Sequence, residues 1–229
     1  MRRLALIVCV LAACSTASEP PAPRPTPPTG VAMPARGLVL VAVDNESPLI
    51  RRMCDHVERE HPPAIEVGVD MWKDTDRRYV DCYLIARDRR TLAAYVAALT
   101  KLDPSLAMPS DRELGYEALP DGTWRTHLLE RTAAIEGRIV KQAHKDWDAA
   151  TGRIQVAIDL TPDAADQLAK LTTQLHGRKL AFVVDGEIVS AAVIEQPITT
   201  GKTTISMGGS DPKQQDAQAD RLVAALQRS

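Results

Sequence analysis

Two cysteines in the central part of the sequence could take part in thiol chemistry, but without a Cys-X-X-Cys spacing they do not indicate a redox site. Cys54 lies on the apolar stripe of a predicted helix, together with Val57. Cys82 alternates with Val80 and Leu84 along a predicted strand. Both thiols are therefore expected to face the interior. They either stay two buried thiols or form one disulfide, and an oxidising compartment favours the disulfide.

The remaining motifs lack the spacing that catalysis or ligand binding needs. His56 and His61 are five residues apart, which is not the spacing of a helical zinc site. The segment "TGKTT" (200–204) resembles the end of a phosphate-binding loop, but Gln196 occupies the position of the required glycine. There is also no Cys-X-X-Cys pair and no G-x-S-x-G motif. We therefore expect no catalytic residue, no metal, no nucleotide and no other cofactor.

Asp185 and Gly186 separate two apolar runs in the segment "LAFVVDGEIVSAAVI" (180–194). Two such runs joined by Asp-Gly indicate a type I′ hairpin, because both turn residues accept positive φ angles. We interpret Asp185 and Gly186 as a structural turn, in which Asp185 makes only local hydrogen bonds and has no catalytic role.

The composition is that of a folded protein with an aliphatic core. Hydrophobic residues make up 45% of the 229 residues and charged residues 25%, so a buried core is expected. Aromatic residues are only 3%, which argues against a base-stacking surface. The formal net charge is -2 and there is no long basic block, so we expect no nucleic-acid partner.

The first fourteen residues resemble a bacterial lipoprotein signal peptide. Arg2 and Arg3 precede the apolar stretch "LALIVCVLAA", which is too short to span a bilayer. The stretch ends in the tetrapeptide 11–14, "LAAC", which is similar to a lipobox. The resemblance implies lipidation of Cys14 with diacylglycerol and an N-acyl chain such as palmitate, and Ser15 favours the outer membrane. The alternative is an ordinary signal peptide with an incidental cysteine.

Residues 15–36 are predicted to form a tether. This segment contains seven prolines and almost nothing to bury, so it is expected to be extended. A proline-rich ligand for another domain is the alternative. Lipidation at Cys14 and this tether together predict a protein anchored in the cell envelope.

Residues 37–119 show the element order β-α-β-β-α-β. The predicted strands are 37–43, 64–71, 78–86 and 114–119, and helices start after Ser47 and Asp88. This order is that of a ferredoxin-like subdomain. The fold class is thus α+β, with a ferredoxin-like base followed by a second α+β subdomain at 120–229.

The second subdomain contains strands and two helices. Segments 121–130 and 137–148 are candidate strands, joined by a short helical turn at 132–136. A firmer strand at 152–160 leads into a helix that starts at Pro162, and the hairpin and a strand at 203–207 follow. Asp211 caps the last helix.

Residues 132–206 closely resemble the head subdomain in the first periplasmic domain of SecD. The resemblance lies in "TGR" before a strand, a helix ending in "LT", and the run "GRKLAFVVDGEIVSA" followed by "VI", "PI" and "G...IS". Residues 37–119 look like the SecD base subdomain by order of elements. One departure is Ala192, where SecD usually has Pro.

The resemblance implies the fold and contact with polypeptide, but not a motor. SecD continues into transmembrane helices that use the proton gradient, whereas no later segment here approaches 18 apolar residues. We therefore expect a lipid-anchored, non-enzymatic periplasmic protein that binds polypeptide or an envelope protein. The alternatives are an envelope hydrolase or an immunity- or inhibitor-type lipoprotein.

Overall fold

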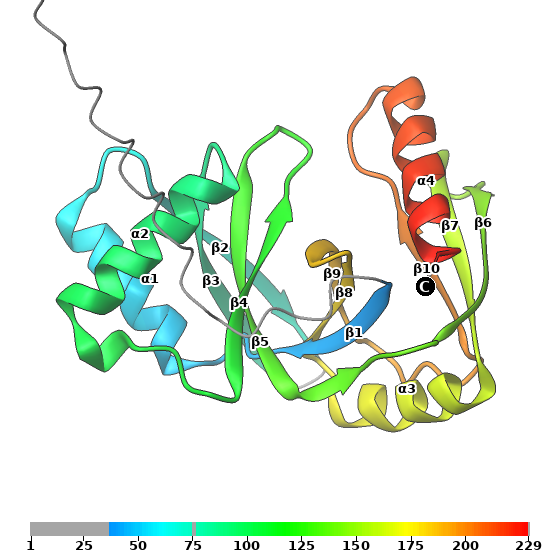
Figure 1. Ribbon diagram of the computed structural model, residues 1–229, viewed down its shortest axis with the longest axis horizontal. Helices are drawn as coiled ribbons and strands as arrows, with labels where there is room; N and C mark the ends of the chain where they lie inside the picture. Colours follow the sequence, from blue (N-terminus) through cyan, green and yellow to red (C-terminus); the bar gives the residue numbers. More distant parts are fainter. Residues whose placement is uncertain (1–36, 75–76, 229) are drawn as a thin grey trace, which may run out of the picture. The chain divides into compact units, whose positions relative to one another are not determined.

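The computed structural model describes residues 37–74 and 77–228, which belong to one compact unit (Figure 1). The α+β class is confirmed, with strands predominating. The helices are α1 (Pro48–Glu60), α2 (Arg89–Leu102), α3 (Pro162–Gln174) and α4 (Pro212–Leu226), and a short 3-10 turn covers Pro104–Leu106. The strands are β1 (Leu38–Val43), β2 (Glu66–Lys73), β3 (Arg78–Ala86), β4 (Arg112–Ala118), β5 (Trp124–Ile135), β6 (Val140–Asp148), β7 (Arg153–Leu160), β8 (Lys179–Val184), β9 (Glu187–Val193) and β10 (Lys202–Ser206).

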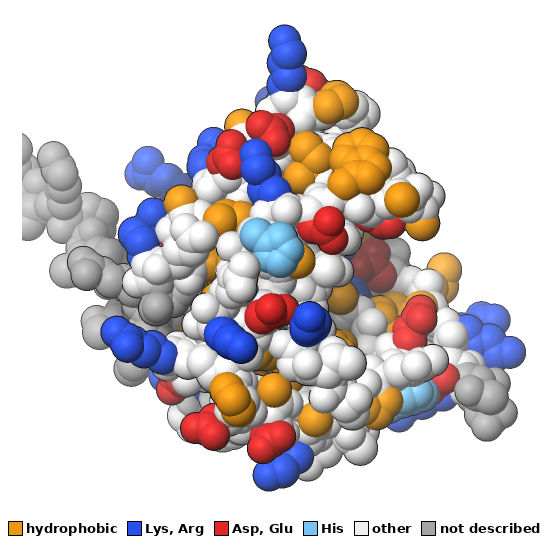
Figure 2. All heavy atoms as spheres, turned by 90° about the vertical axis from the view of Figure 1, so that its right-hand side faces the viewer, with side chains coloured by type: hydrophobic (Ala, Val, Ile, Leu, Met, Phe, Trp, Pro, Cys, Tyr) orange, Lys and Arg blue, Asp and Glu red, His pale blue; other side chains and the backbone are white. Residues whose placement is uncertain are grey.

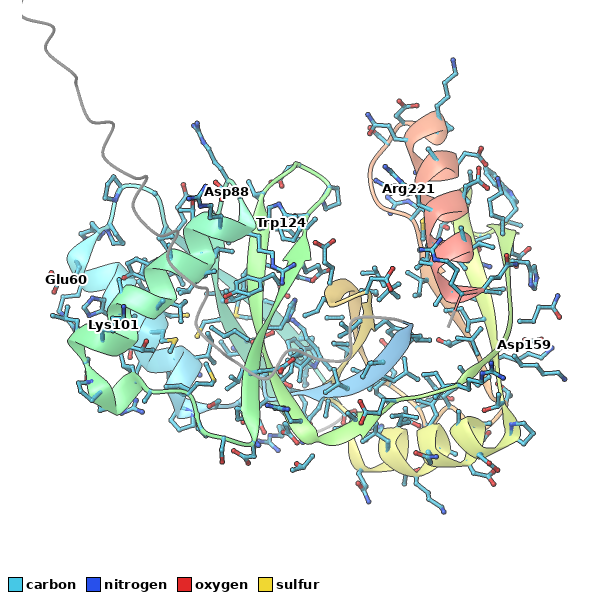
Figure 3. All side chains as sticks on the ribbon, in the orientation of Figure 1. Glu60, Asp88, Lys101, Trp124, Asp159 and Arg221 are labelled. Carbon is cyan, nitrogen blue, oxygen red and sulfur yellow. The ribbon has the colours of Figure 1, made fainter. Side chains whose placement is uncertain are left out.

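Polar side chains begin three of the helices. The hydroxyl of Ser47 accepts a hydrogen bond from the backbone N–H of Leu49, 3.2 Å away, at the start of α1. Asp88 accepts from Thr91 N at the start of α2 (Figure 3), and Asp211 accepts from Lys213 N at the start of α4. These caps satisfy backbone N–H groups that have no partner within the helix.

Five strands close into a ring. The order in the seven-stranded sheet is β1-β8-β9-β4-β5-β3-β2. In addition, β1 pairs with β5, so the strands from β1 to β5 in this order form a closed ring. Alternate residues of β1 point to opposite sides, and Val39, Val41 and Val43 pack with buried residues of β5, β8 and β9. Gly115 leaves room there, because a Cβ atom would lie 2.4 Å from Ile188 Cδ1.

Two further cores lie outside the ring. The other face of β1 packs with a three-stranded sheet, of order β10-β7-β6, and with α3 and α4. In the other core, α1 and α2 cover the apolar face of β2 and β3 (Figure 1). None of the described helices is long and apolar enough to cross a membrane.

Two expectations about the fold require correction. The helical turn expected at 132–136 is absent, because β5 continues to Ile135, pairs with β1 and so remains extended. The element order predicted for 37–119 is present, but the ferredoxin-like sheet is not confirmed. Such a subdomain pairs its own four strands, whereas here β5 lies between β3 and β4, and β1 pairs with β5 and β8. The boundary predicted near Pro120 stays a prediction.

Candidate functional site

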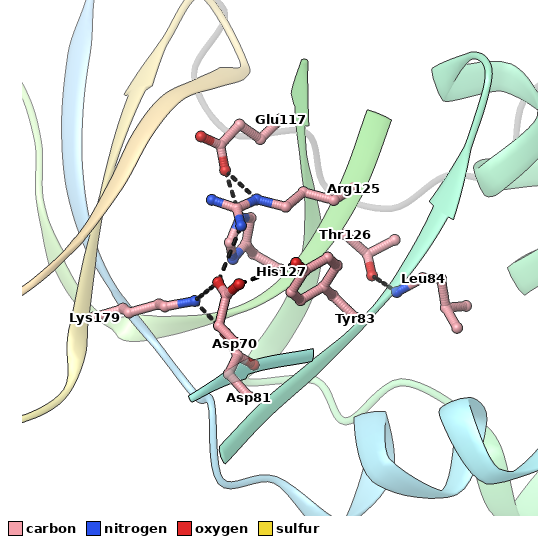
Figure 4. A network of polar contacts seen from close by, with 9 residues as sticks. All are labelled: Asp70, Asp81, Tyr83, Leu84, Glu117, Arg125, Thr126, His127 and Lys179. Atoms are coloured by element: carbon pink, nitrogen blue, oxygen red, sulfur yellow. Dashed lines mark hydrogen bonds and ion pairs between the residues drawn. The ribbon is translucent and has the colours of Figure 1, made fainter. Parts of the chain in front are cut away.

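A buried lysine lies between two carboxylates at the start of β8 (Figure 4). Lys179 Nζ is 2.7 Å from Asp70 Oδ2 and 2.6 Å from Asp81 Oδ2. The two aspartates are opposite each other in the β2–β3 register, so they would repel without the lysine. The side chains of Lys179 and Asp81 are only 4% and 6% exposed. The arrival of Lys179 from β8 is what allows Asp81 to be buried.

Arg125 extends this network to β4 and β5. Its Nη1 donates to Asp70 Oδ2 over 3.1 Å, and its Nε donates to Glu117 Oε2 over 2.7 Å. Glu117 Oε2 also lies 2.7 Å from Nε2 of the buried His127. The hydroxyl of Tyr83 donates to Asp70 Oδ1 over 3.0 Å. The charged groups therefore bond one another, which holds strands together rather than presenting a reactive group.

The pKa values of two carboxyl groups follow from these bonds. Burial alone would raise the pKa of Asp70, but the hydrogen bond and charge of Lys179 outweigh it and lower the pKa below its usual value. Burial likewise opposes ionisation of Glu117, and hydrogen bonds with His127 and Arg125 lower its pKa. Both groups are ionised and paired at neutral pH, so neither is a free general base.

A crevice of about 350 Å³ opens next to this network, at the end of β2. Its volume falls in the range typical of small binding sites. The lining has three apolar side chains, three charged side chains and one glycine: Trp72, Val193, Ile194, Lys73, Asp74, Glu195 and Gly177. Its lining is thus a mixture of apolar and charged side chains.

Trp72 is held rigidly in this crevice. Its ring stacks on Tyr79 with centroids 5.5 Å apart, and its Nε1 donates to the carbonyl oxygen of Gly177 over 2.8 Å. Lys179 Nζ lies 5.0 Å from the centroid of the Trp72 ring, within cation–π range. Gly177 has a φ of 75°, and a Cβ atom there would lie 2.3 Å from the Tyr79 hydroxyl. The wall of the crevice therefore requires glycine at this position.

The strand that leads to the crevice is an exposed sheet edge. Among the strands of residues 37–74 and 77–228, β2 pairs with β3 alone, in an unbroken register from Glu66 to Lys73. Val69 and Met71 on this strand are 49% and 70% exposed. The strand contains no proline and no bulge, two of the features that protect an edge from pairing with another chain, but it does carry the charged residues Glu66, Asp70 and Lys73.

The face formed by β6 and α4 has a different character. Figure 2 shows acidic, basic and hydrophobic side chains interspersed over it. Lys145 of β6, for example, bridges Asp216 and Asp220 of α4 at 2.8 and 2.9 Å. Mixed exposed charges of this kind are typical of a solvated surface. The β2 edge and the crevice are therefore the better candidate site.

A comparison with known protein families shows to which family the chain is related. The family model for the SecDF P1 head subdomain matches residues 113–228, half of the sequence.

The chain belongs to the SecDF P1 head subdomain family.

The chain is also similar to protein translocase subunits. Protein translocase subunit SecD of Thermobaculum terrenum is 37% identical over 87 residues, which cover 38% of this chain and 16% of that protein. Protein translocase subunit SecDF of Thermus thermophilus is 43% identical over 54 residues, 24% of this chain and 7% of that protein. The chain thus spans less than a fifth of each of these relatives.

A solved structure is also similar, and its title describes SecDF as a membrane component that enhances protein export. The similarity covers 84% of this chain and 93% of that chain, with 18% identity and a TM-score of 0.38.

The region matched by the SecDF P1 head family contains only part of the candidate site. It begins in β4 and contains Gly177, Val193 and Glu195 from one wall of the crevice. Trp72 and the exposed residues of β2 lie before it. The crevice therefore combines the head-like region with the preceding segment.

The structure places the predicted site residues that it describes in two separate locations. Cys14 lies outside the described residues. Cys54 on α1 and Cys82 on β3 are free thiols, and both pack in the core beneath α1 and α2. Asp185 and Gly186 form the turn between β8 and β9, with φ angles of 51° and 80°.

Asp185 is more than a local turn residue. Its Oδ1 accepts a hydrogen bond from the backbone N–H of Gly37, 3.3 Å away, and its Oδ2 lies 3.7 Å from Arg228 Nη2. The expectation of purely local hydrogen bonds is therefore wrong, because β8 pairs with β1 and brings residue 37 beside the turn.

Sequence reasoning missed Trp72 and Lys179. The predicted strand ends at residue 71, whereas in the structure Trp72 continues the alternation with Asp70. Lys179 precedes an apolar run and carries no local sign of burial. No group of three potential metal ligands occurs among the residues that the structure describes.

Proposed function

We propose that this protein is a lipid-anchored, non-enzymatic component of the bacterial envelope whose SecD-like domain faces the periplasm and binds extended polypeptide. Relatives named as protein translocase subunits support a role connected with protein export. The lipobox-like sequence ending at Cys14 supports the anchor, and Ser15 supports the outer membrane. The observation that carries the proposal is the exposed edge of β2, which ends at the crevice of Trp72.

An extended polypeptide suits the β2 edge because it offers the matching chemistry. An edge strand has backbone N–H and C=O groups directed away from its sheet, and an extended segment can pair with them as an added strand. Backbone pairing requires little sequence specificity, as a protein that meets many unfolded chains would need. Val69 and Met71 would pack with apolar side chains of the bound segment.

The crevice supplies a place for one side chain of the bound segment. Trp72 and Ile194 offer apolar contact, and Glu195 adds a negative charge. Glu195 forms no ion pair with another residue of 37–74 or 77–228. A segment that carries an apolar residue with a basic neighbour would therefore complement this end of the edge.

Photo-crosslinking tests the proposal. The photoreactive amino acid benzoylphenylalanine is placed at position 71 on β2 or, as a control, at position 102 on α2. Leu102 is a suitable control because it is also a highly exposed apolar residue, at 77%. The probe is a reduced and carboxymethylated protein, which cannot fold. We expect crosslinks from position 71 and few from position 102.

A second pair of variants tests the contribution of apolar contact. Met71→Glu should weaken binding of the unfolded probe, whereas Leu102→Glu should leave it unchanged. Equal crosslinking from both positions, or none from position 71, would refute polypeptide binding at this edge. The envelope-hydrolase alternative is not favoured, because the acidic groups of the buried network are bonded to basic partners.

A further inference from the structure

The backbone of β2 is directed outward at the residues that carry its exposed apolar side chains. Leu84 of β3 lies opposite Val67 in the β2–β3 register, and its N–H donates to Thr126 Oγ1 on β5 over 3.0 Å. The N–H of Leu84 thus points away from β2, and the two members of such an antiparallel pair both turn their backbone groups outward. Because the register is unbroken, every second residue of β2 does the same. Val67, Val69 and Met71 therefore direct their N–H and C=O groups to the open edge.

These three residues also share one face of the sheet, because side chains alternate along a strand. Val67 packs with the core beneath α1 and α2, whereas Val69 and Met71 on the same face are exposed. The same residues thus offer backbone groups for strand pairing and an apolar row for packing.

The sequence of β2 is self-complementary when two antiparallel copies are aligned about Val69. A two-fold axis perpendicular to the sheet keeps equivalent faces on the same side, so an even-numbered residue meets an even-numbered one. The opposed pairs, one residue from each copy, are Val69–Val69, Val67–Met71, Gly68–Asp70 and Glu66–Trp72. Apolar residues meet apolar residues on the helix-covered face, and no two like charges are opposed on either face.

The two neighbouring alignments bring like charges together. An axis at Asp70 places Asp70 opposite its own copy, and an axis at Gly68 places Glu66 opposite Asp70. Like charges directly opposite each other destabilise a strand pair. Alignments nearer to either end of β2 shorten the paired segment. Charge and length therefore both favour the axis at Val69.

We propose that β2 pairs antiparallel with β2 of a second copy of this chain about Val69, and that an extended polypeptide binds the edge by displacing that copy. Val69 exchanges hydrogen bonds with its equivalent across the axis, and Val67 packs with Met71 on both sides of it. The displacement step rests on the proposed function, because it concerns the same edge. The pairing itself covers an edge that would otherwise be free to aggregate.

A charge exchange on the axis tests the pairing in the purified full chain. Donor and acceptor fluorophores are attached to the C-termini of separate preparations. Wild-type copies should show energy transfer. Val69→Lys alone and Val69→Glu alone should lose it, because each variant opposes two like charges, and a mixture of the two should recover it. Leu102→Lys and Leu102→Glu on α2 are the matched controls, and they should show the same transfer alone and mixed.

Circular dichroism first establishes that each variant is folded. Absence of energy transfer between wild-type copies, or equal transfer in every combination of the position 69 variants, would overturn the pairing. An excess of the reduced and carboxymethylated probe should lower the transfer between wild-type copies. Crosslinking of this probe at position 71 without any wild-type energy transfer would reject the pairing and leave polypeptide binding intact. Energy transfer between wild-type copies that persists with the probe in excess would instead reject the displacement step.

Discussion

Lys179 Nζ and Asp81 Oδ2 lie 2.6 Å apart and form a buried salt bridge between β8 and β3. The bridge links the hairpin inside the SecDF P1 head match to a strand that precedes the match. Asp70 accepts a second hydrogen bond from the same ammonium group. One lysine therefore neutralises two carboxylates from a neighbouring strand pair.

Removal of this lysine should strongly destabilise the protein. Lys179→Met would leave Asp81 buried without its cationic partner, and breaking such a pair costs about 3–5 kcal/mol of unfolding free energy. The matched control is Lys202→Met, because Lys202 is exposed and lies 4.0 Å from Asp159. That change should cost less than about 1 kcal/mol. Urea unfolding of both variants measures the difference, and similar losses would contradict a structural role for the buried bridge.

Stability should fall in acid, in part through Glu117. Its pKa is lower in the folded protein than its ordinary value of 4.5, and that of Asp70 is lower than 3.8. The stabilisation from both groups is thus fully present above their unfolded pKa values and is lost as the pH falls through the folded ones. Glu117→Gln should therefore show a smaller loss of unfolding free energy between about pH 6 and pH 3 than the unmodified protein. Urea titrations at several pH values test this, and an unchanged pH dependence would argue against the assigned contribution.

The crevice should be sensitive to a single methyl group at Gly177. Gly177→Ala places a Cβ atom against the Tyr79 hydroxyl and also strains a φ angle of 75°. Gly122→Ala is the matched control, since its φ is 86° but a Cβ atom there meets nothing within 4 Å. Each variant should lose about 1–2 kcal/mol from backbone strain, and only Gly177→Ala should also displace Trp72 and weaken binding of the unfolded probe. Equal behaviour of the two variants would show that the clash is relieved without movement of the crevice.

The turn at 185–186 should depend on its backbone more than on the charge of Asp185. Asp185→Asn keeps an oxygen that can accept from Gly37 N and loses only an exposed pair with Arg228, so its stability should change by less than about 1 kcal/mol. Gly186→Val forces a β-branched residue to a positive φ and should cost about 1–3 kcal/mol. Thermal unfolding compares the two. A stable Asp185→Asn protein that no longer binds the unfolded probe would instead assign Asp185 a functional role.

The proposed anchor predicts the fate of Cys14→Ser. Lipidation requires the cysteine thiol, so the variant should lack the lipid and either remain unprocessed or leave the membrane fraction. Metabolic labelling with palmitate and fractionation of the envelope measure both properties. Ser15→Thr keeps Cys14 and serves as the control. Unlabelled, fully soluble wild-type protein would contradict the lipobox interpretation.

Local chemistry in the sequence was sufficient for many element boundaries. Ser47, Asp88 and Asp211 indicated where α1, α2 and α4 begin, because a capping side chain needs only the N–H groups of the next turn. Asp-Gly between two apolar runs likewise indicated the β8–β9 turn, whose φ angles depend on those two residues. The inward orientation of Cys54 and Cys82 also followed from the periodicity of one helix and one strand, and both lie in the core beneath α1 and α2.

Pairing between distant segments was decided only in the tertiary structure. Residues 132–136 looked able to form a helical turn, but their pairing with β1 keeps them extended. The same strand separates β3 from β4, which is why the element order alone suggested a different sheet. Asp81 is buried because Lys179 approaches it from β8, nearly a hundred residues later. Strand partners and buried ion pairs depend on which chain segments meet in space, and that choice is made by the packing of the whole domain rather than by neighbours in sequence.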